Sequence, residues 1–250
     1  MPPVTVLNAE GASAFLIVAD HAGNAFPRSA GQLGLAPAEQ VRHIAWDIGI
    51  APVCRALAQR LDATLIQQTY SRLIIDCNRP PRSPASIPEA SERTPVPGNR
   101  GLGEAEISAR EREIFHPYHD RIAAEIERRA QAGRPAVLVA MHSFTPVYLG
   151  VARPWHAGVL YHRDARLAGA VLAALRQEPG LCVGDNEPYS VDDSTDYTIP
   201  VHGERRGLLH VGIEIRQDLI ADAAGQAQWG ERIARTLTAA LAATPGACPA

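Results

Sequence analysis

The sequence predicts an α/β protein with a mostly parallel, doubly wound sheet and helices on both of its faces. Short apolar runs bounded by turn residues alternate with amphipathic segments of helical period, which is the pattern of repeated strand–helix–strand units. Of the 250 residues, 46% are apolar and 20% are charged, a balance typical of a globular protein. This length allows one full hydrophobic core, so we expect a single domain over residues 1–250 with its core at about 12–245.

Five short apolar runs are the expected strands of this sheet. Their continuous apolar character is that of strands that are covered on both faces. In chain order they are Phe15–Ala19, Leu73–Ile75, Ala136–Met141, Gly158–Tyr161 and Leu208–Ile215.

Segments with helical periodicity lie between and after these runs. Ile48–Leu61 places its apolar side chains on one face, with Asp47 as the expected N-cap. Glu104–Ala132 is a long charged helix that Pro117 should bend or interrupt. Two further amphipathic helices are expected at Ala165–Gln177 and Gln226–Ala243.

Two long stretches lack this periodicity. Residues 80–103 are rich in Pro, Ser, Gly and Asn, and residues 184–207 are rich in Asp, Ser, Thr and Tyr. Loops of this length are uncommon in a compact domain unless they cover a functional site or are disordered. Because core strands resume after each stretch, we expect both to be loops that cover a site.

Composition excludes several classes of protein. All 24 basic residues are arginine, so the chain lacks the lysine that a Walker A loop or a pyridoxal-phosphate enzyme requires. The formal net charge of −3 gives no reason to expect nucleic acid or an anionic membrane as a partner. No apolar window is long enough to span a membrane and the N-terminus lacks a signal-peptide pattern, so we expect a cytoplasmic protein. The four cysteines, Cys54, Cys77, Cys182 and Cys248, form no CxxC pair, which argues against a disulfide framework or a thiolate zinc site.

Chemically active side chains collect at the carboxyl ends of the predicted strands. His21 follows the first run, Asn78 and Arg79 follow the second, His142 follows the third, and Glu214 lies in the last. This edge of an open α/β sheet is where ligands bind. The coincidence of these positions is the strongest functional signal in the sequence.

His21 and His142 are the expected ligands of a metal ion. Neutral imidazole binds zinc well, and a catalytic zinc takes three protein ligands and a water. We prefer Asp47 as the third ligand, although the same carboxylate could serve only as a helix cap. Asn24, three residues after His21, is the alternative, but a neutral amide is a poor ligand for zinc. Zn²⁺ is therefore the expected cofactor, with another divalent metal as the alternative.

Glu214 is the expected general base, because a carboxylate in an apolar strand is costly unless it is paired or functional. Burial would raise its pKa, which suits a group that takes a proton from water and returns it to a leaving amine. The alternative is a structural ion pair with Arg216 or another arginine. Arginine binds carboxylates through a planar fork, so the expected substrate-binding residues are Asn78, Arg79, Arg72 and Arg216.

With these motifs assembled, the sequence resembles the N-formylglutamate amidohydrolase family. The resemblance rests on five segments in one order between about residues 14 and 220: Asp20–Pro27, His43–Gly49, Tyr70–Pro80, Met141–Pro146 and His210–Ile220. The family is similar to the zinc carboxypeptidase and aspartoacylase group, which implies a zinc-exopeptidase-like fold. Carried over by motif, His21 and His142 fall on metal positions, Asn78 and Arg79 on the carboxylate-binding pair, and Glu214 on the base. Where the wider group has a glutamate, this chain has Asn24.

The resemblance implies zinc-dependent hydrolysis of N-formyl-L-glutamate to formate and L-glutamate, a step of histidine degradation. The expected partner is therefore a small N-acyl amino acid. Two alternatives stay open from the sequence: a deacylase of other N-acyl amino acids or short glutamyl peptides, and a non-catalytic homologue that binds a carboxylate or a metal.

Overall fold

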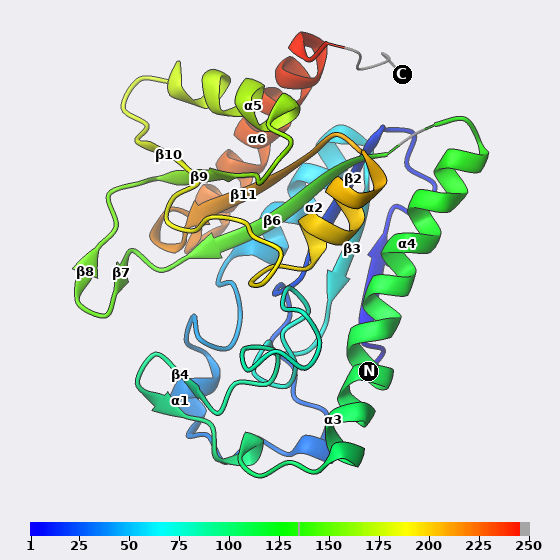
Figure 1. Ribbon diagram of the computed structural model, residues 1–250. Coiled ribbons are helices and arrows are strands. Elements are labelled where there is room, and N and C mark those ends of the chain that lie inside the picture. The colour runs from blue at the N-terminus through cyan, green and yellow to red at the C-terminus, as the bar shows by residue number, and fades with distance from the viewer. Residues whose placement is uncertain (135, 246–250) are drawn as a thin grey trace.

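The computed structural model describes residues 1–134 and 136–245, which form a sheet of seven strands covered by helices on both faces (Figure 1). The strand order is β1-β3-β2-β6-β11-β9-β10. Strands β3, β2, β6 and β11 run parallel, β1 is antiparallel to β3, and β9 is antiparallel to β11. The strands are β1 Val4–Leu7, β2 Phe15–Ala19, β3 Thr64–Gln68, β6 Val137–Phe144, β9 Ala157–Leu160, β10 Val183–Asp185 and β11 His210–Arg216. The predicted fold class, a mostly parallel α/β sheet, is confirmed.

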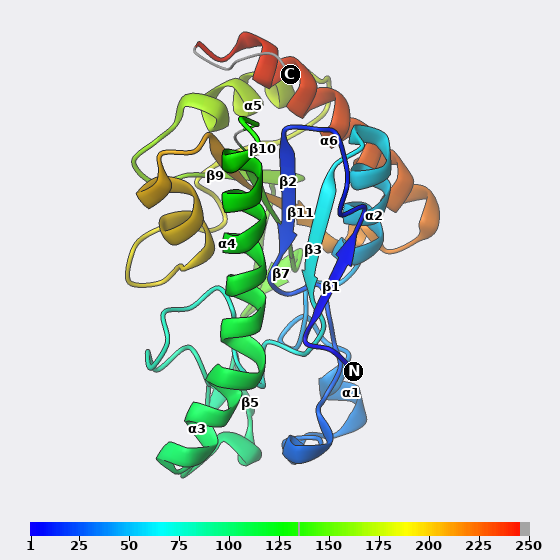
Figure 2. The same ribbon diagram turned by 90° about the vertical axis from the view of Figure 1, so that its right-hand side faces the viewer.

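Helices pack on the two faces of the sheet in separate apolar clusters (Figure 2). Residues of α2 (Ile50–Leu61), α5 (Arg166–Arg176) and α6 (Ala223–Ala243) join one face, while α4 (His116–Gln131) covers the other. The short helices α1 (Pro37–Gln40) and α3 (Glu104–Arg110) lie with the long loops below the sheet (Figure 1). In the described part of the chain, no helix is long and apolar enough to cross a membrane.

The strand expected at Leu73–Ile75 does not form, because these buried residues lie in and directly after a turn at 72–74. The backbone N–H of Ile74 donates to the carbonyl of Ser71 (2.9 Å). The apolar run reflects burial rather than strand pairing. The strand in this part of the chain is β3, Thr64–Gln68. Its sequence does not read as a continuous apolar run because it ends in Gln67 and Gln68.

Two helix boundaries also differ from expectation. α2 begins at Ile50 after Gly49, which adopts a left-handed backbone (φ 80°), and Asp47 is not its cap. A side chain on Gly49 would meet the carbonyl of Ile220 at 2.4 Å, so the turn requires glycine. The long helix is interrupted by a π-helical segment, Glu111–Phe115, just before Pro117. Pro117 lacks the N–H that a continuous α-helix would need there.

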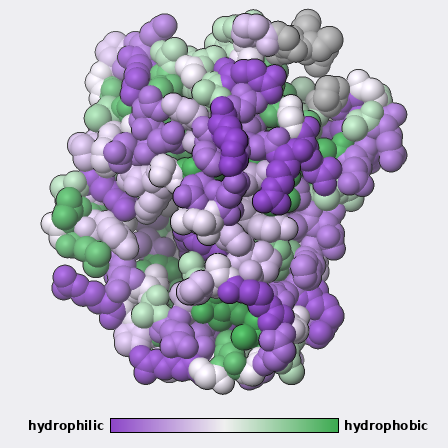
Figure 3. All heavy atoms as spheres, in the orientation of Figure 1, coloured by the Kyte–Doolittle hydropathy of each residue, from purple (hydrophilic) through white to green (hydrophobic). Residues whose placement is uncertain are grey.

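Two small hairpins project from the loops. One consists of β4 (Ala90–Ser91) and β5 (Thr94–Pro95), and the other of β7 (Val147–Tyr148) and β8 (Val151–Ala152). The β7–β8 hairpin forms a hydrophobic patch at the left edge of an otherwise mostly hydrophilic face (Figure 3). The other elements of 80–103 and 184–207 are short turns of 3-10 or π helix at Pro97–Asn99, Ile199–Gly203 and Glu204–Arg206.

A pair of buried histidines fixes the 184–207 loop against α4. The Nε2 of His119 lies 2.7 Å from the carbonyl of Cys77, so this nitrogen carries the proton, and the other nitrogen accepts from Nε2 of His202 (3.0 Å). Burial lowers the pKa of His119 to about 4 and that of His202 to about 3. Both rings are therefore neutral in the folded protein at neutral pH.

We expect this pair to make the fold sensitive to acid. Below pH 6.5 the two histidines bind protons in the unfolded chain but not in the folded protein. The free energy of unfolding therefore decreases as pH falls, by roughly 6 kcal/mol in all near pH 4. His202→Gln keeps a donor toward His119 but cannot titrate, so it should remove about half of this loss. Urea unfolding in the presence of a chelator at several pH values measures it, with the exposed His116→Gln as control. Equal pH dependence in wild type and His202→Gln would contradict the assignment.

Candidate active site

An open cleft of ≈860 Å³ lies at the carboxyl ends of the central parallel strands. Side chains from the ends of β2, β6 and β11 line its floor, and residues of the 80–103 and 184–207 loops line its walls. The expectation that these loops cover a site therefore agrees with their position. Seven of the eight predicted site residues line the cleft: His21, Asp47, Arg72, Asn78, Arg79, His142 and Glu214.

The sheet register sets His142 and Glu214 side by side. They are directly paired on the parallel strands β6 and β11, so their side chains project from the same face. The preceding residues on that face, Ala140 and Gly212, are small and also line the cleft. The two functional groups are thus positioned by strand pairing.

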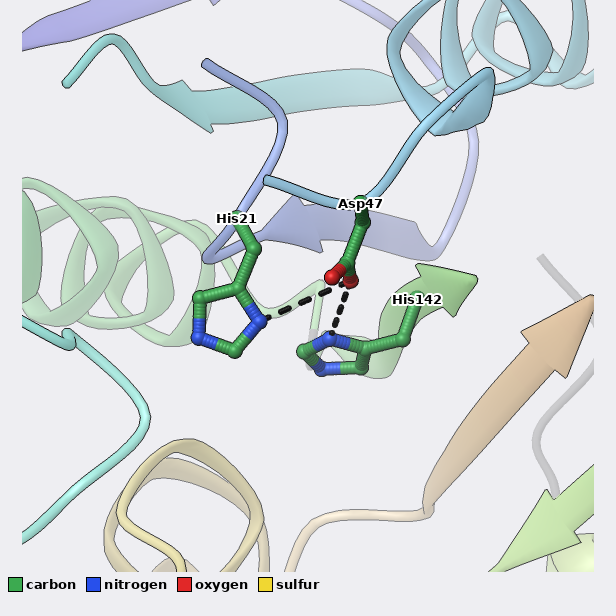
Figure 4. A group of neighbouring side chains, drawn as sticks. All are labelled: His21, Asp47 and His142. Atoms are coloured by element: carbon green, nitrogen blue, oxygen red, sulfur yellow. Dashed lines mark hydrogen bonds and ion pairs between the residues drawn. The ribbon is translucent and has the colours of Figure 1, made fainter. Parts of the chain in front are cut away.

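His21, Asp47 and His142 form a buried group in which one donor atom of each converges (Figure 4). Nδ1 of His142 lies 3.0 Å from Oδ2 of Asp47, and Nδ1 of His21 lies 3.5 Å from the same oxygen. All three donor atoms lie within 4.8 Å of one another. The buried Nδ1 of His21 has no hydrogen-bond partner among the described residues. Two imidazoles and a carboxylate are a donor set that suits a divalent metal such as zinc.

Each histidine is held from behind by a second carboxylate. Oδ1 of Asp76 lies 2.7 Å from Nε2 of His21, and Oδ2 of Asp20 lies 3.3 Å from Nε2 of His142. Such contacts fix the ring orientation and leave Nδ1 free to bind a metal. Sequence reasoning did not assign a role to Asp20 or Asp76, although Asp20 adjoins His21 in the chain and Asp76 lies two residues before Asn78.

Mutual attraction keeps these buried groups charged. Burial opposes ionisation of Asp20, but the hydrogen bond and charge of His142 outweigh it and lower its pKa to about 2. Burial likewise opposes ionisation of Asp47, whose pKa is lowered by His21 and His142. The neighbouring carboxylates raise the pKa of His142 well above its ordinary value, despite its burial. The carboxylates thus balance positive charge held on the imidazoles, and a bound cation would take the place of those protons.

Glu214 is buried at 6% exposure, and its Oε2 has no hydrogen-bond partner in the described part of the chain. Burial raises its pKa to about 7. A carboxyl with this pKa exchanges protons readily at neutral pH. The alternative ion pair with Arg216 does not form, because Arg216 donates instead to Asp218 (2.8 Å).

Arg216 is the predicted substrate-binding residue that the structure does not bring to the cleft. Its guanidinium is also engaged by the backbone carbonyls of residues 153–155. These contacts hold the chain between β8 and β9, outside the residues that line the cleft, and the substrate-binding role expected for Arg216 stays a prediction. Arg216 is the last residue of β11, and alternation along the strand, which predicts the same face as Glu214, does not reveal that its guanidinium turns to Asp218.

The other predicted substrate-binding residues line the cleft but are engaged with protein groups. Arg72 donates twice to Oδ2 of Asp76 (2.9 and 2.6 Å), and Arg79 contacts the carbonyl of Thr195. Asn78 accepts from the backbone N–H groups of residues 197 and 198 and donates to Asp196. Asn78 thus anchors the 184–207 loop over the cleft.

Asn24, the alternative third metal ligand, does not line the cleft. A second group of possible metal ligands, His162, Asp193 and Glu204, lies nearer the surface. Arg163 already contacts both of its carboxylates, at 2.5 and 2.8 Å. The buried group is therefore the stronger candidate for a metal.

A His/Asp/His group beside a buried glutamate, at the carboxyl edge of a mostly parallel sheet, is an arrangement suited to metal-dependent hydrolysis. The family model of N-formylglutamate amidohydrolase matches residues 13–221. The chain belongs to this family and is a hydrolase that acts on amides.

Two solved structures show the same fold over nearly the whole chain. A gene product from Agrobacterium tumefaciens is 42% identical, with a TM-score of 0.94 over 97% of this chain and 96% of that one. N-formylglutamate amidohydrolase from Ralstonia eutropha is 22% identical, with a TM-score of 0.70 over 96% of this chain and 97% of that one. None of the curated proteins compared with the chain matches it.

Proposed function

We propose that the protein hydrolyses N-formyl-L-glutamate to formate and L-glutamate with a divalent metal, zinc in the first place, held by His21, Asp47 and His142. The observation that carries this proposal is the buried Glu214, which is paired across the sheet with His142, one of the proposed metal ligands. Its Oε2 has no hydrogen-bond partner among the described residues, and burial raises its pKa to about 7. The family match and the similarity to N-formylglutamate amidohydrolase from Ralstonia eutropha support the substrate.

The metal would supply positive charge that polarises the acyl carbonyl and acidifies water. Ionised Glu214 takes a proton from the attacking water as the water oxygen bonds to the acyl carbon. Protonated Glu214 then delivers this proton to the amine nitrogen as the carbon–nitrogen bond breaks. Asp20 and Asp76 hold the histidine rings in place during both steps.

We propose that Arg79, with Arg72 beside it, binds a carboxylate of the substrate. Both guanidinium groups line the cleft and keep part of their surface exposed, 27% and 24% of the side chain. A substrate carboxylate would replace the weak contact of Arg79 with Asp196 at 3.7 Å. Asn78 would keep the loop and Arg79 in position.

The test is the release of formate and glutamate from N-formyl-L-glutamate by the purified, zinc-loaded protein. We expect turnover that a chelator removes and that zinc restores, with the D-enantiomer at least about 100-fold slower because the carboxylate and the amide must be aligned together. Comparing these rates with those for N-formyl-L-aspartate and short glutamyl peptides measures how strongly kcat/KM depends on the amino-acid part of the substrate. If the zinc-loaded protein releases no formate, the proposed substrate is wrong.

A further inference from the structure

A second groove borders the cleft, and no part of the proposed reaction uses it. This groove, of ≈350 Å³, is lined by Arg42, His43, Glu92, Arg93, Val147, Leu149 and Gly150. His43 and Glu92 also line the main cleft, so the two spaces share a wall. The main cleft alone has the volume of a site for ligands larger than N-formylglutamate.

One wall of the groove is the apolar β7–β8 hairpin. Val147 and Leu149 line the groove and are each 50% exposed, and Val151 on the same hairpin is 69% exposed. Single exposed apolar side chains are ordinary, but here they gather at one hairpin beside the cleft (Figure 3). An apolar ligand group would cover the two that line the groove.

Leu149 also breaks a local rule of structure. Its backbone is left-handed (φ 50°), a conformation that favours Asn or Gly and is strained for leucine. Because Leu149 is 50% exposed, its burial offsets little of this strain. Local conflicts of this kind are expected at functional sites.

Both walls of the groove are held in place. The Arg153 guanidinium carbon lies 4.7 Å from the ring centre of Tyr148 and 4.8 Å from that of Tyr189, and the Tyr189 hydroxyl accepts from Arg153 (2.8 Å). This contact joins the hairpin to the 184–207 loop. On the opposite wall, Arg42 bridges Glu39 (2.6 Å) and Glu92 (2.5 Å). The groove is thus a formed surface rather than a gap between loose loops.

We propose that the groove binds an apolar acyl chain, so that the enzyme also hydrolyses amino acids carrying an N-acyl group longer than formyl. The inference rests on the proposed amide hydrolysis. The acyl side is assigned because Arg79, which would bind the amino-acid carboxylate, lines the cleft but not the groove. A saturated chain of medium length fits along the apolar hairpin wall, while on the opposite wall Arg42 and His43 both contact Glu92 and Arg93 is exposed to solvent.

The test compares N-formyl-, N-butyryl- and N-hexanoyl-L-glutamate with wild type and two hairpin variants. We expect kcat/KM to rise about ten-fold from butyryl to hexanoyl, since each methylene that becomes buried contributes up to about four-fold. Val147→Thr with Leu149→Asn removes the apolar wall and places a residue suited to the left-handed turn. This double variant should lose the gain while keeping hydrolysis of N-formylglutamate within about two-fold. Val151→Thr, on the same hairpin but outside the groove, should keep the gain.

Binding to Glu214→Gln, measured by calorimetry, separates failure of the inference from failure of the proposed function. N-hexanoyl-L-glutamate should bind about ten-fold more tightly than N-butyryl-L-glutamate, and the double hairpin change should abolish the difference. Equal binding of the two compounds, or a gain that survives the double change, would overturn the groove assignment. If N-hexanoyl-L-glutamate binds tightly but wild type does not hydrolyse it, the groove assignment would stand and the proposed hydrolysis of this compound would be refuted.

Discussion

Replacing His142 or His21 with alanine is expected to remove the bound metal and, with it, amide hydrolysis. Each imidazole supplies one of three converging donors, and the neighbouring carboxylates alone cannot complete the site. We expect wild type to hold about one metal ion per chain and each variant to lose at least about a thousand-fold in kcat/KM. Elemental analysis and formate release on the same samples measure both effects.

Matched substitutions decide the third ligand. Asp47→Asn should behave like the histidine variants, because it removes the carboxylate oxygen that faces both rings. Asn24→Ala should keep the metal, since Asn24 does not line the cleft. His116→Ala, on the exposed surface, is the control for handling of the protein. Full metal content in His142→Ala would refute the proposed metal site. Loss of metal in Asn24→Ala but not in Asp47→Asn would show that Asn24, not Asp47, is the third ligand.

The second large effect is expected from Glu214→Gln, which should abolish turnover while leaving the metal content unchanged. Glutamine has nearly the same shape and fits the same place on β11, but it cannot take a proton from water at neutral pH. We expect kcat to fall by about 100- to 10,000-fold, the range that a positioned base contributes. Steady-state kinetics on metal-assayed samples give the comparison.

An unaltered fold is part of the expected result. Because Glu214 makes no ion pair with Arg216, its replacement should leave the strand and the loop before β9 in place. Arg216→Gln is the matched control on the same strand, and it should keep kcat within a few-fold because its side chain lies outside the cleft. A Glu214→Gln protein with nearly wild-type kcat would show that another group is the base.

The elements that the sequence predicted correctly are those whose pattern arises from their own burial. The strands β2, β6, β9 and β11 are continuous apolar runs because helices or loops cover them, and α2, α5 and α6 show a 3.6-residue period because one stripe faces the sheet. β3 was missed because the sheet buries two of its glutamines, whose amides find partners only in the folded protein. A strand was wrongly predicted at Leu73–Ile75, because a buried turn can be as apolar as a buried strand.

The same division holds for the site. His21, His142 and Glu214 could be selected from the sequence, since polar residues at the ends of apolar runs are costly without a function. The sequence does not show where each side chain points. For this reason Arg216 was expected in the site, and no role was assigned to Asp20 or Asp76. The sequence by itself determined the fold class and the candidate residues for the chemistry, because both can be inferred from the local hydrophobic pattern and the type of each residue. Only the tertiary structure decided which of them meet, because strand register, the turn after β3 and the loop held by Asn78 bring together groups far apart in the chain.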